Sequence, residues 1–276
     1  MSSHSTTLAD PLGASLEGGR PVRLSVSWER VLPLLLPFAL LLLWQLAAQQ
    51  RWVSAQILPE PVRVYQTFVE LLRTGEILDG LLISMRRIAL GFSAGAGLGL
   101  LIGSALGVST TLRVYLEPVL RALFAVPSIG WIPILILIFG IDEALKIIIV
   151  IKAVMVPVII NTMQGIRGIP AVYQEVADVL RLRPATRFLR LTVPAALPTI
   201  FGGIRLGLSN AFVALVVVEM LAATEGLGYM MVWGRTLFQL DIVMVGMVVI
   251  GVVGLVLDRS LSVIERHVLQ WGGRHG

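Results

Sequence analysis

Long apolar segments dominate this chain and limit what it can fold into. A helix needs about 20 apolar residues to cross the hydrocarbon core of a bilayer. Charged residues make up only 14% of the chain, compared with roughly 25% in soluble domains. The pattern predicts an all-α membrane protein with about six transmembrane helices. The apolar runs fall at about residues 31–48, 81–108, 112–139, 144–164, 197–223 and 242–257.

The residue types that are missing exclude several classes of function. The chain has no cysteine, and its three histidines, His4, His267 and His275, all lie toward its ends. Thiolate catalysis, disulfides and a histidine metal site inside the membrane are therefore excluded, and we expect no metal and no cofactor in this chain. The phosphate-binding pattern G-x-x-x-x-G-K-[ST] is also absent from the sequence. We therefore expect a non-catalytic chain, and any ATP that drives it must be hydrolysed by another polypeptide.

The distribution of arginine predicts the topology. The chain is basic, with an isoelectric point near 10.2, but its arginines are scattered between apolar segments rather than gathered with aromatic residues. We therefore expect a lipid bilayer and no nucleic acid as partner. The positive-inside rule places both termini in the cytoplasm. We interpret the first apolar run as an uncleaved span, because it is long for a signal peptide and lies far from the N-terminus.

The predicted domain organisation follows from the same composition. Residues 1–27 are polar and are predicted to form a disordered cytoplasmic tail. Residues 28–272 are predicted to form the transmembrane domain, and 273–276 a short C-terminal tail.

A polar segment at residues 165–198 interrupts the apolar pattern between the fourth and fifth runs. It is too charged to lie in hydrocarbon, and the positive-inside rule places it in the cytoplasm. Its acidic residues include Glu175 and Asp178. They are outnumbered by five arginines, namely Arg167, Arg181, Arg183, Arg187 and Arg190.

Two prolines indicate how this polar segment folds. Pro170 and Pro184 both suit the first turn of a helix, where the missing N–H group costs nothing. We therefore expect two short helices, at about residues 170–182 and 184–192. The first is amphipathic, and its apolar face is expected to pack on the membrane domain. The hairpin fits either an interfacial anchor or a docking surface for a soluble partner.

A glycine recurs at every fourth residue along the second apolar run. Such spacing lines one face of a helix without side chains and lets another backbone approach closely. Each glycine costs about 1 kcal/mol in a soluble helix interior, so five in register indicate a packing role. We expect packing within the chain, and an interface with another subunit is the alternative. The five residues are Gly91, Gly95, Gly99, Gly103 and Gly107.

Polar and ionisable side chains inside the apolar runs are candidates for a polar path or its gate. An unpaired charge at the depth of Glu219 costs at least about 2.5 kcal/mol, so we expect this residue to be paired with a cation or hydrogen-bonded. Lys152 and Arg205 are the cations that could pair with an acid or attract an anionic substrate. Ser209 and Asn210 could line the path or form hydrogen bonds between helices.

The polar segment resembles the cytoplasmic loop of the permeases of ABC importers. The pattern in that family is Glu-Ala-Ala, three residues, Gly, nine residues, Ile, one residue and Leu-Pro. Here Glu175-Val176-Ala177 and Leu191-Thr192-Val193-Pro194 keep this spacing, and Arg181 stands where the family usually has glycine.

Other blocks extend the resemblance to about residues 30–272. They are similar to the branch of the family that imports sulfonates, taurine and nitrate. These blocks are ILPEPVRV from Ile57, VPSIGWIPILILIFGIDEALKI from Val126, NTMQGIRGI from Asn161 and VVVEMLAATEGLGYMM from Val216.

The resemblance implies a type I importer fold with about six transmembrane helices and a cytoplasmic coupling helix within about residues 165–198. It implies a homodimer in the bacterial inner membrane, two ATP-binding cassette subunits that bind ATP and Mg, and a periplasmic solute-binding protein. Aliphatic sulfonates are the first choice of solute, followed by taurine, nitrate, bicarbonate or a thiamine-precursor pyrimidine. The implied ATPase-coupling residues are Glu175, Val176, Ala177, Asp178, Leu180, Arg181 and Leu182.

Two other classes of membrane protein remain as alternatives. An ion-coupled secondary transporter would show an internal repeat and acids buried at the bilayer midplane. The sequence has no convincing repeat, and Glu219 is its only deeply placed acid. A membrane enzyme would need a nucleophile with a base, which leaves only serine–lysine pairings such as Ser209 with Lys152.

Overall fold

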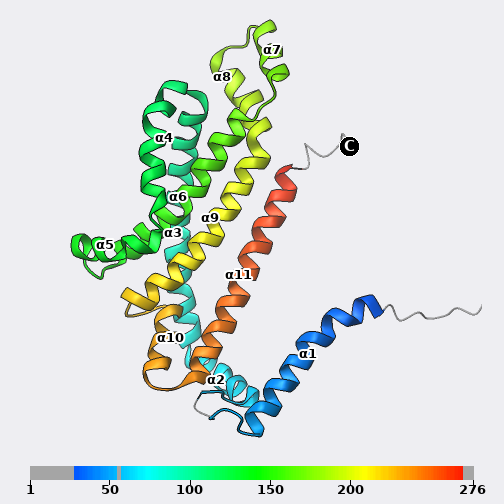
Figure 1. The fold of residues 1–276 in the computed structure, drawn as a ribbon, viewed down its shortest axis with the longest axis vertical. Helices are drawn as coiled ribbons and strands as arrows, with labels where there is room; N and C mark the ends of the chain where they lie inside the picture. Colours follow the sequence, from blue (N-terminus) through cyan, green and yellow to red (C-terminus); the bar gives the residue numbers. More distant parts are fainter. Residues whose placement is uncertain (1–27, 55–56, 270–276) are drawn as a thin grey trace, which may run out of the picture. The chain divides into compact units, whose positions relative to one another are not determined.

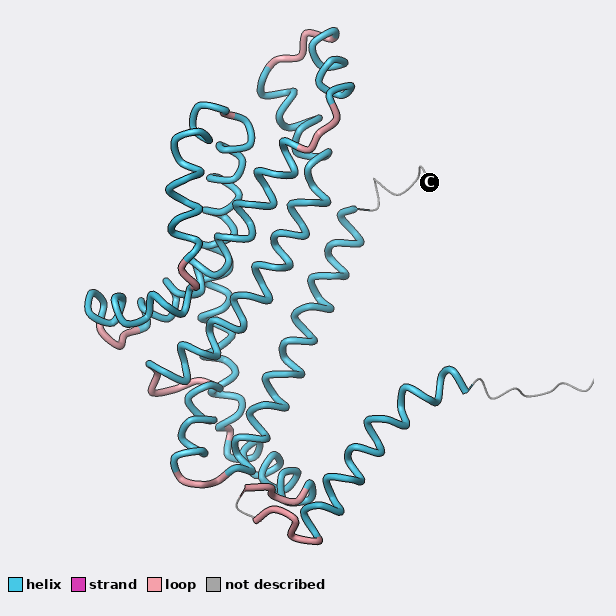
Figure 2. The backbone as a smooth tube through the Cα atoms, viewed as in Figure 1, coloured by secondary structure: helices cyan, strands magenta, loops and turns pink. Residues whose placement is uncertain are grey.

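The computed structural model describes residues 28–54 and 57–269, with side chains from residue 35 onward. Within these ranges the chain is helical and contains no β-strand, which confirms the predicted all-α fold (Figure 2). The predicted tails at 1–27 and 273–276 lie outside the described residues.

The helices follow one another with short connections. They are α1 (Trp28–Gln49), α2 (Pro61–Thr74), α3 (Glu76–Val108), α4 (Thr110–Ala125), the 3₁₀ turn η1 (Ser128–Trp131), α5 (Ile132–Phe139), α6 (Glu143–Arg167), α7 (Ala171–Val179), α8 (Pro184–Arg187), the π turn η2 (Phe188–Thr192), α9 (Val193–Ala222), α10 (Leu227–Thr236) and α11 (Leu240–Leu269).

The chain divides into two compact units within α1. The first unit ends at Leu43 and the second begins at Trp44. In α1 the stretch Leu35–Gln49 is apolar. All the helices from α2 onward belong to the second unit, and they are described below without reference to the first.

Three helices are long and apolar enough to cross a membrane by themselves. They are α3, the 39-residue helix Pro184–Ala222 and α11. A fourth crossing arises if α4 and the η1–α5 pair are counted together. The remaining two predicted runs correspond to α6, which has 25 residues, and to α1.

The predicted third span is not one continuous helix. Its two parts, Thr110–Ala125 and Ser128–Phe139, are bent by 85° relative to each other. The break falls at Val126, whose backbone is extended. This conformation is the one that a residue before proline prefers, and here Pro127 follows.

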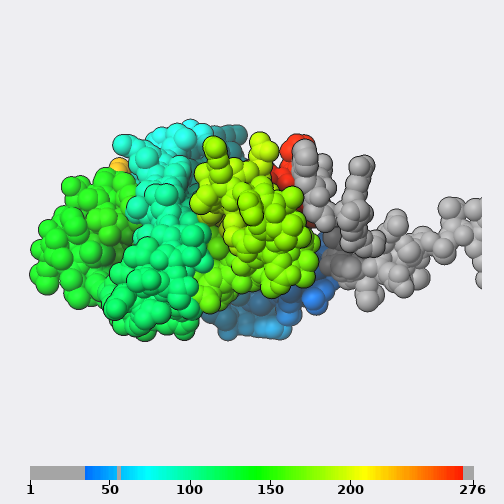
Figure 3. Space-filling model, turned by 90° about the horizontal axis from the view of Figure 1, so that it is seen from above, coloured from blue at the N-terminus to red at the C-terminus, as the bar shows by residue number. Residues whose placement is uncertain are grey.

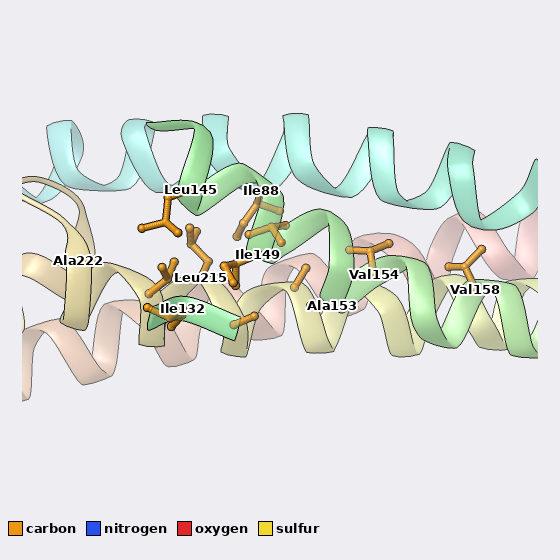
Figure 4. Packing of buried hydrophobic residues seen from close by; sticks show 13 residues of the cluster. Ile88, Ile132, Leu145, Ile149, Ala153, Val154, Val158, Leu215 and Ala222 are labelled. Atoms are coloured by element: carbon orange, nitrogen blue, oxygen red, sulfur yellow. The ribbon is translucent and has the colours of Figure 1, made fainter. Parts of the chain in front are cut away.

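Helix α6 is the centre of the second unit. It packs against α3 on one side and against α9 on the other (Figure 1). The main apolar core lies where α3, α6, α9 and the η1–α5 segment meet, as Figure 4 shows for Ile88, Leu145, Ile149 and Leu215. These side chains are almost completely buried, so the core fixes the three long helices against one another.

The glycines of α3 lie against α6 in matching register. A Cβ atom at Gly95 would stand 2.7 Å from the carbonyl oxygen of Ile151, and one at Gly103 would stand 2.8 Å from that of Ile159. Val150, Val158 and Ile166 face the remaining three glycines of the series. At all five positions α6 is therefore too close for α3 to carry a side chain.

The second short helix predicted at 184–192 is not a separate element. Helix α8 runs through η2 into α9, and together they form the helix Pro184–Ala222. Pro194 and Pro198 have no N–H group to donate, which would usually interrupt a helix. The π turn accommodates this loss: the N–H of Val193 donates to the carbonyl of Phe188, five residues earlier.

Candidate functional site

A polar hairpin projects from one end of the second unit. It consists of α7, the turn after it and α8 (Figure 1), and the space-filling view from above shows it in yellow-green at the near end (Figure 3). It is connected directly to α6 before it and to α9 after it. A force on the hairpin would therefore reach the two central helices without passing through a long loop.

The apolar side chains of α7 point away from the rest of the chain. Val172, Val176 and Val179 are 65%, 49% and 82% exposed, while Ala177 is only 2% exposed. The prediction that this apolar face packs on the membrane domain is therefore wrong. Of these apolar side chains only the small Ala177 is buried against its own chain, and the larger ones remain available to a partner.

The turn after α7 keeps a left-handed geometry although glycine is absent. Arg181 has a φ of +46°, and its N–H donates to the carbonyl of Asp178 at 3.0 Å. The N–H of Leu182 reaches the carbonyl of Ala177 at 3.1 Å. This pair of bonds is the Schellman ending of a helix, which usually has glycine at the left-handed residue. The geometry explains why the family pattern has glycine at this position.

Arg181→Gly is expected to stabilise the hairpin slightly. A residue with a Cβ atom in the left-handed region costs roughly 1–2 kcal/mol, and glycine removes this cost. The melting temperature of the purified protein should rise, whereas Leu180→Gly, at a residue with right-handed backbone, should lower it. A lower melting temperature for Arg181→Gly would show that the arginine side chain makes a stabilising contact that outweighs the strain.

An ion pair connects the two arms of the hairpin. Arg187 of α8 donates to Asp178 of α7 at 2.6 Å. Both side chains are partly exposed to solvent, so the pair contributes at most about 1 kcal/mol. Its main effect is to hold α7 at a fixed angle to the start of the long helix.

A buried ion pair lies at the other end of α9. Glu219 and Arg87 of α3 are both 1% exposed, and Glu219 Oε1 accepts a hydrogen bond from Arg87 Nη1 at 2.8 Å. The Ser84 hydroxyl lies 2.8 Å from the same carboxylate and accepts from the N–H of Leu227. The N–H of Gly228 donates to Glu219 Oε2 at 3.0 Å. Both oxygens of the Glu219 carboxylate therefore have hydrogen-bond partners.

Arg87 also reaches two carboxylates nearer the surface. Its guanidinium donates to the carboxylate of Glu143 at the start of α6 and lies 3.5 Å from the carboxylate of Glu225, and it also donates to the backbone carbonyl of Glu225 at 2.9 Å. Lys146 donates to Glu143 at 3.0 Å. This cluster, the Arg87 cluster, therefore joins α3, α6, α9 and the loop before α10.

Sequence reasoning did not single out Arg87. It follows Arg86 near the start of an apolar run, where arginines commonly mark the end of a span. The sequence also has a glycine, Gly226, in the EGLG segment after Glu219. In the structure this glycine has a φ of +109°, and a Cβ atom there would stand 2.6 Å from Glu219 Oε1. A close approach of this loop to the acid could have been expected from that glycine.

Of the five polar residues predicted for a path, two line one cavity. Lys152 and Asn210 lie at a cavity of about 290 Å³ bounded by α6, α9 and the break after α4. Lys152 Nζ donates to the carbonyl of Val126 at 2.9 Å and lies 5.2 Å from the centre of the Trp131 ring.

The other three predicted path residues lie elsewhere. Arg205 makes two hydrogen bonds of 2.9 Å to Asp258 of α11, and Ser209 donates to the backbone carbonyl of Arg205. Glu219 belongs to the Arg87 cluster. The positive charge of Arg205 is therefore neutralised within the chain, whereas Lys152 pairs with no carboxylate in the part of the chain that the structure describes.

The fold and these sites together define a class of protein. The long helices are apolar enough to cross a membrane, a cavity with a cationic group lies among them, and a hairpin connected to α6 and α9 projects from one end. Such a chain suits a transport subunit that a soluble partner moves.

Comparison with known proteins identifies the family. Residues 95–270 match the family described as binding-protein-dependent transport system inner membrane component. The chain is 41% identical over 252 residues to a putative aliphatic sulfonates transport permease protein of Bacillus subtilis (strain 168), which covers 91% of each chain. A protein of the same description from Escherichia coli (strain K12) is 37% identical over 242 residues, covering 88% of this chain and 92% of the relative. The chain therefore belongs to this family of ABC importer permeases, as its sequence motifs predicted.

A solved structure gives the fold. The methionine ABC transporter MetNI in inward-facing conformations is similar with a TM-score of 0.55 and 16% identity, over 72% of this chain and 95% of that one. The predicted type I importer fold is thus confirmed. Chains of this family are non-catalytic, multi-pass membrane subunits, and the family implies a separate ATPase and a solute-binding protein as partners.

Proposed function

We propose that this chain is the permease of an importer that carries an aliphatic sulfonate from a periplasmic binding protein into the cytoplasm by alternating access. The main support is the 41% identity to a relative named for aliphatic sulfonates, which extends over 91% of both chains. The cavity beside Lys152 agrees with an anionic solute, because its charged side chain is a cation.

We also propose that two copies assemble with two ATPase subunits that bind ATP and Mg. Arg205 and Asp258 are 44% and 40% exposed, although they lie on the long apolar helices α9 and α11. Charges of this kind are costly in contact with lipid. The face of α9 and α11 that bears them therefore needs cover from protein or water, and a second copy beside a water-filled path would provide it.

Coupling to the ATPase is assigned to the hairpin. The exposed valines of α7, together with Glu175 and Arg181, form a surface of mixed apolar and charged character that suits a groove on a soluble partner. Closure of the ATPase dimer on ATP would move this lever, and α6 and α9 would carry the motion to the path. The hairpin and both termini are then cytoplasmic.

Glu175→Lys is expected to uncouple the chain from its ATPase. The residue lies on the exposed surface of α7, so reversal of its charge should leave the fold and the melting temperature unchanged. Copurification of a tagged ATPase and ATP-driven uptake should both fall at least about tenfold, since like-charge contacts at an interface cost several kcal/mol. Glu70→Lys, an exposed charge reversal on α2, is the control and should copurify normally. Normal copurification and uptake with Glu175→Lys would refute the assignment.

The substrate is tested with the whole transporter. ATP hydrolysis by the reconstituted permease–ATPase complex is measured with its binding protein against alkanesulfonates, taurine, nitrate, bicarbonate and a thiamine-precursor pyrimidine. We expect the strongest stimulation from an alkanesulfonate. Stimulation by another solute alone would replace the proposed substrate and keep the importer. Failure to assemble with any ATPase would favour the ion-coupled secondary transporter instead.

A further inference from the structure

Lys152 is a cation within the membrane domain that no carboxylate of the described residues neutralises. It lies in the middle part of α6 and is half-buried. Other buried or half-buried cations of the domain, such as Arg87 and Lys146, face carboxylates at 2.8–3.0 Å. Among the described residues, Lys152 forms no ion pair, and its ammonium group has two polar interactions, with the carbonyl of Val126 and with the Trp131 ring.

The cavity beside Lys152 has the chemistry of a small anion site. Its polar side chains are Ser128, Lys152 and Asn210, its other lining residues are apolar, and none of the described residues that line it is acidic. Its volume of about 290 Å³ is close to the lower end of ligand pockets, roughly 300 Å³. A solute with one compact charged group and a short apolar tail matches these dimensions and this lining.

A second hydrogen-bond donor lies near Lys152. The indole N–H of Trp131 is buried and has no acceptor within the described part of the chain. A buried donor without an acceptor costs about 1–3 kcal/mol. Within the described residues, the break after α4 therefore has a buried donor that no acceptor satisfies.

A purely structural role does not account for the charge of Lys152. The bond to the Val126 carbonyl satisfies an acceptor that is freed where α4 ends before Pro127. One N–H group is enough for that bond, and an ammonium group has three. A neutral donor could make the same contact without the cost of at least about 2.5 kcal/mol for a charge within a membrane.

We infer that Lys152, with Ser128 and Asn210, forms a subsite of the translocation path that holds the anionic headgroup of the solute during passage. The inference rests on the proposed function, because it takes the sulfonate group as the ligand. A single ammonium group attracts the three sulfonate oxygens without enclosing them, and this weak hold allows the solute to leave again. The apolar walls of the cavity accept the alkyl chain.

The test uses the intact permease–ATPase complex in liposomes with its binding protein. Uptake of radiolabelled ethanesulfonate and ATP hydrolysis are measured for Lys152→Gln, which keeps a donor for the Val126 carbonyl, and for Lys152→Arg, which keeps the charge. Lys152→Gln should lower uptake at least about tenfold while hydrolysis triggered by the loaded binding protein persists. Lys152→Arg should retain most of the uptake. Arg73→Gln, which removes one charge from the exposed surface of α2, should behave as wild type.

Asn210→Asp provides a second test that leaves Lys152 in place. The change is nearly isosteric and puts a negative charge into the cavity, where it would neutralise the ammonium group. We expect ethanesulfonate uptake to fall at least about tenfold, and Asn210→Ser to keep most of it. Unchanged uptake in Asn210→Asp would overturn the subsite.

The remaining outcomes separate the inference from the proposed function. Equal uptake by wild type and Lys152→Gln overturns the subsite and leaves the sulfonate importer intact. Equal loss in Lys152→Gln and Lys152→Arg, together with a lower melting temperature, shows that the lysine is structural and also overturns it. If wild type itself takes up no ethanesulfonate but assembles normally, the proposed substrate fails and the inference fails with it.

Discussion

Arg87→Met is expected to destabilise the membrane domain by about 3–5 kcal/mol, because it leaves the buried carboxylate of Glu219 without its counter-charge. Both side chains are 1% exposed, so water cannot replace the guanidinium. The bonds from Arg87 to Glu143 and Glu225 would be lost as well. The purified protein should therefore melt at a much lower temperature or fail to accumulate in the membrane.

Two further variants show whether the loss comes from the buried charge. Arg87→Met combined with Glu219→Met should recover part of the stability, since a buried pair can often be replaced by apolar residues at little cost. A double-mutant cycle of melting temperatures would give the coupling between the two residues. Arg86→Met, at the exposed neighbouring position, is the control. If Arg87→Met were as stable as Arg86→Met, the account of this cluster would be wrong.

The position of the Arg87 cluster shows which helices it holds together. It connects α3, α6, α9 and the loop before α10 where α6 begins and α9 ends, which are the ends of these two helices away from the hairpin (Figure 1). The glycine contact joins α3 to α6 over most of their remaining length. The helices on which α7 acts therefore form one body that can move as a unit during alternating access.

Gly95→Ala is expected to cost about 1–3 kcal/mol, although it adds a single methyl group. The added Cβ atom would stand 2.7 Å from the carbonyl oxygen of Ile151 and 2.9 Å from Cβ of Val154. The backbone of α6 cannot rotate away as a flexible side chain could, so α3 and α6 would have to separate.

Gly97→Ala is a matched control on the same helix. A Cβ atom at Gly97 would meet nothing within 4 Å, and alanine is favoured over glycine in a helix by about 1 kcal/mol. The melting temperature should fall for Gly95→Ala and stay constant or rise for Gly97→Ala. Equal behaviour of the two variants would show that the glycine series is not a close helix contact.

The sequence predicted that another helix approaches α3 closely, but it did not predict which helix this is. The four-residue spacing of the glycines indicates a face that another backbone can reach. The facing positions on α6 are valine, isoleucine and threonine, which are ordinary residues of any apolar helix. Because the partner has no distinctive pattern, only the folded chain shows that it is α6.

The pairing partners of the polar residues could not be predicted from the sequence either. The cost of a buried charge predicted a cation or hydrogen bonds beside Glu219, but its partner Arg87 is 132 residues away in the sequence, and pairing at that distance depends on the fold. Arg205 and Lys152 were equivalent candidates in the sequence. The structure separates them, because Asp258 is within reach of Arg205 and no carboxylate within the described residues pairs with Lys152.

The position of the hairpin was predicted correctly, but two of its structural details were not. The prolines and the loop motif placed α7 correctly, since Pro170 comes just before its first residue. The continuity from α8 into α9 was missed because a π turn that accommodates prolines has no simple sequence signal. The direction of the valines was missed because amphipathic spacing does not show whether the apolar face meets the same chain or a partner.

The central claim is that a separate ATPase binds the α7 surface, and crosslinking tests it most directly. The chain has no cysteine, so Val179→Cys, at a residue that is 82% exposed, introduces a unique attachment point for a maleimide–diazirine probe. Tyr115→Cys, on the exposed surface of α4, is the control. In the assembled complex we expect light to join the ATPase to the probe at position 179 and much less at position 115. Crosslinking of the ATPase from position 115 but not from 179 would contradict the claim.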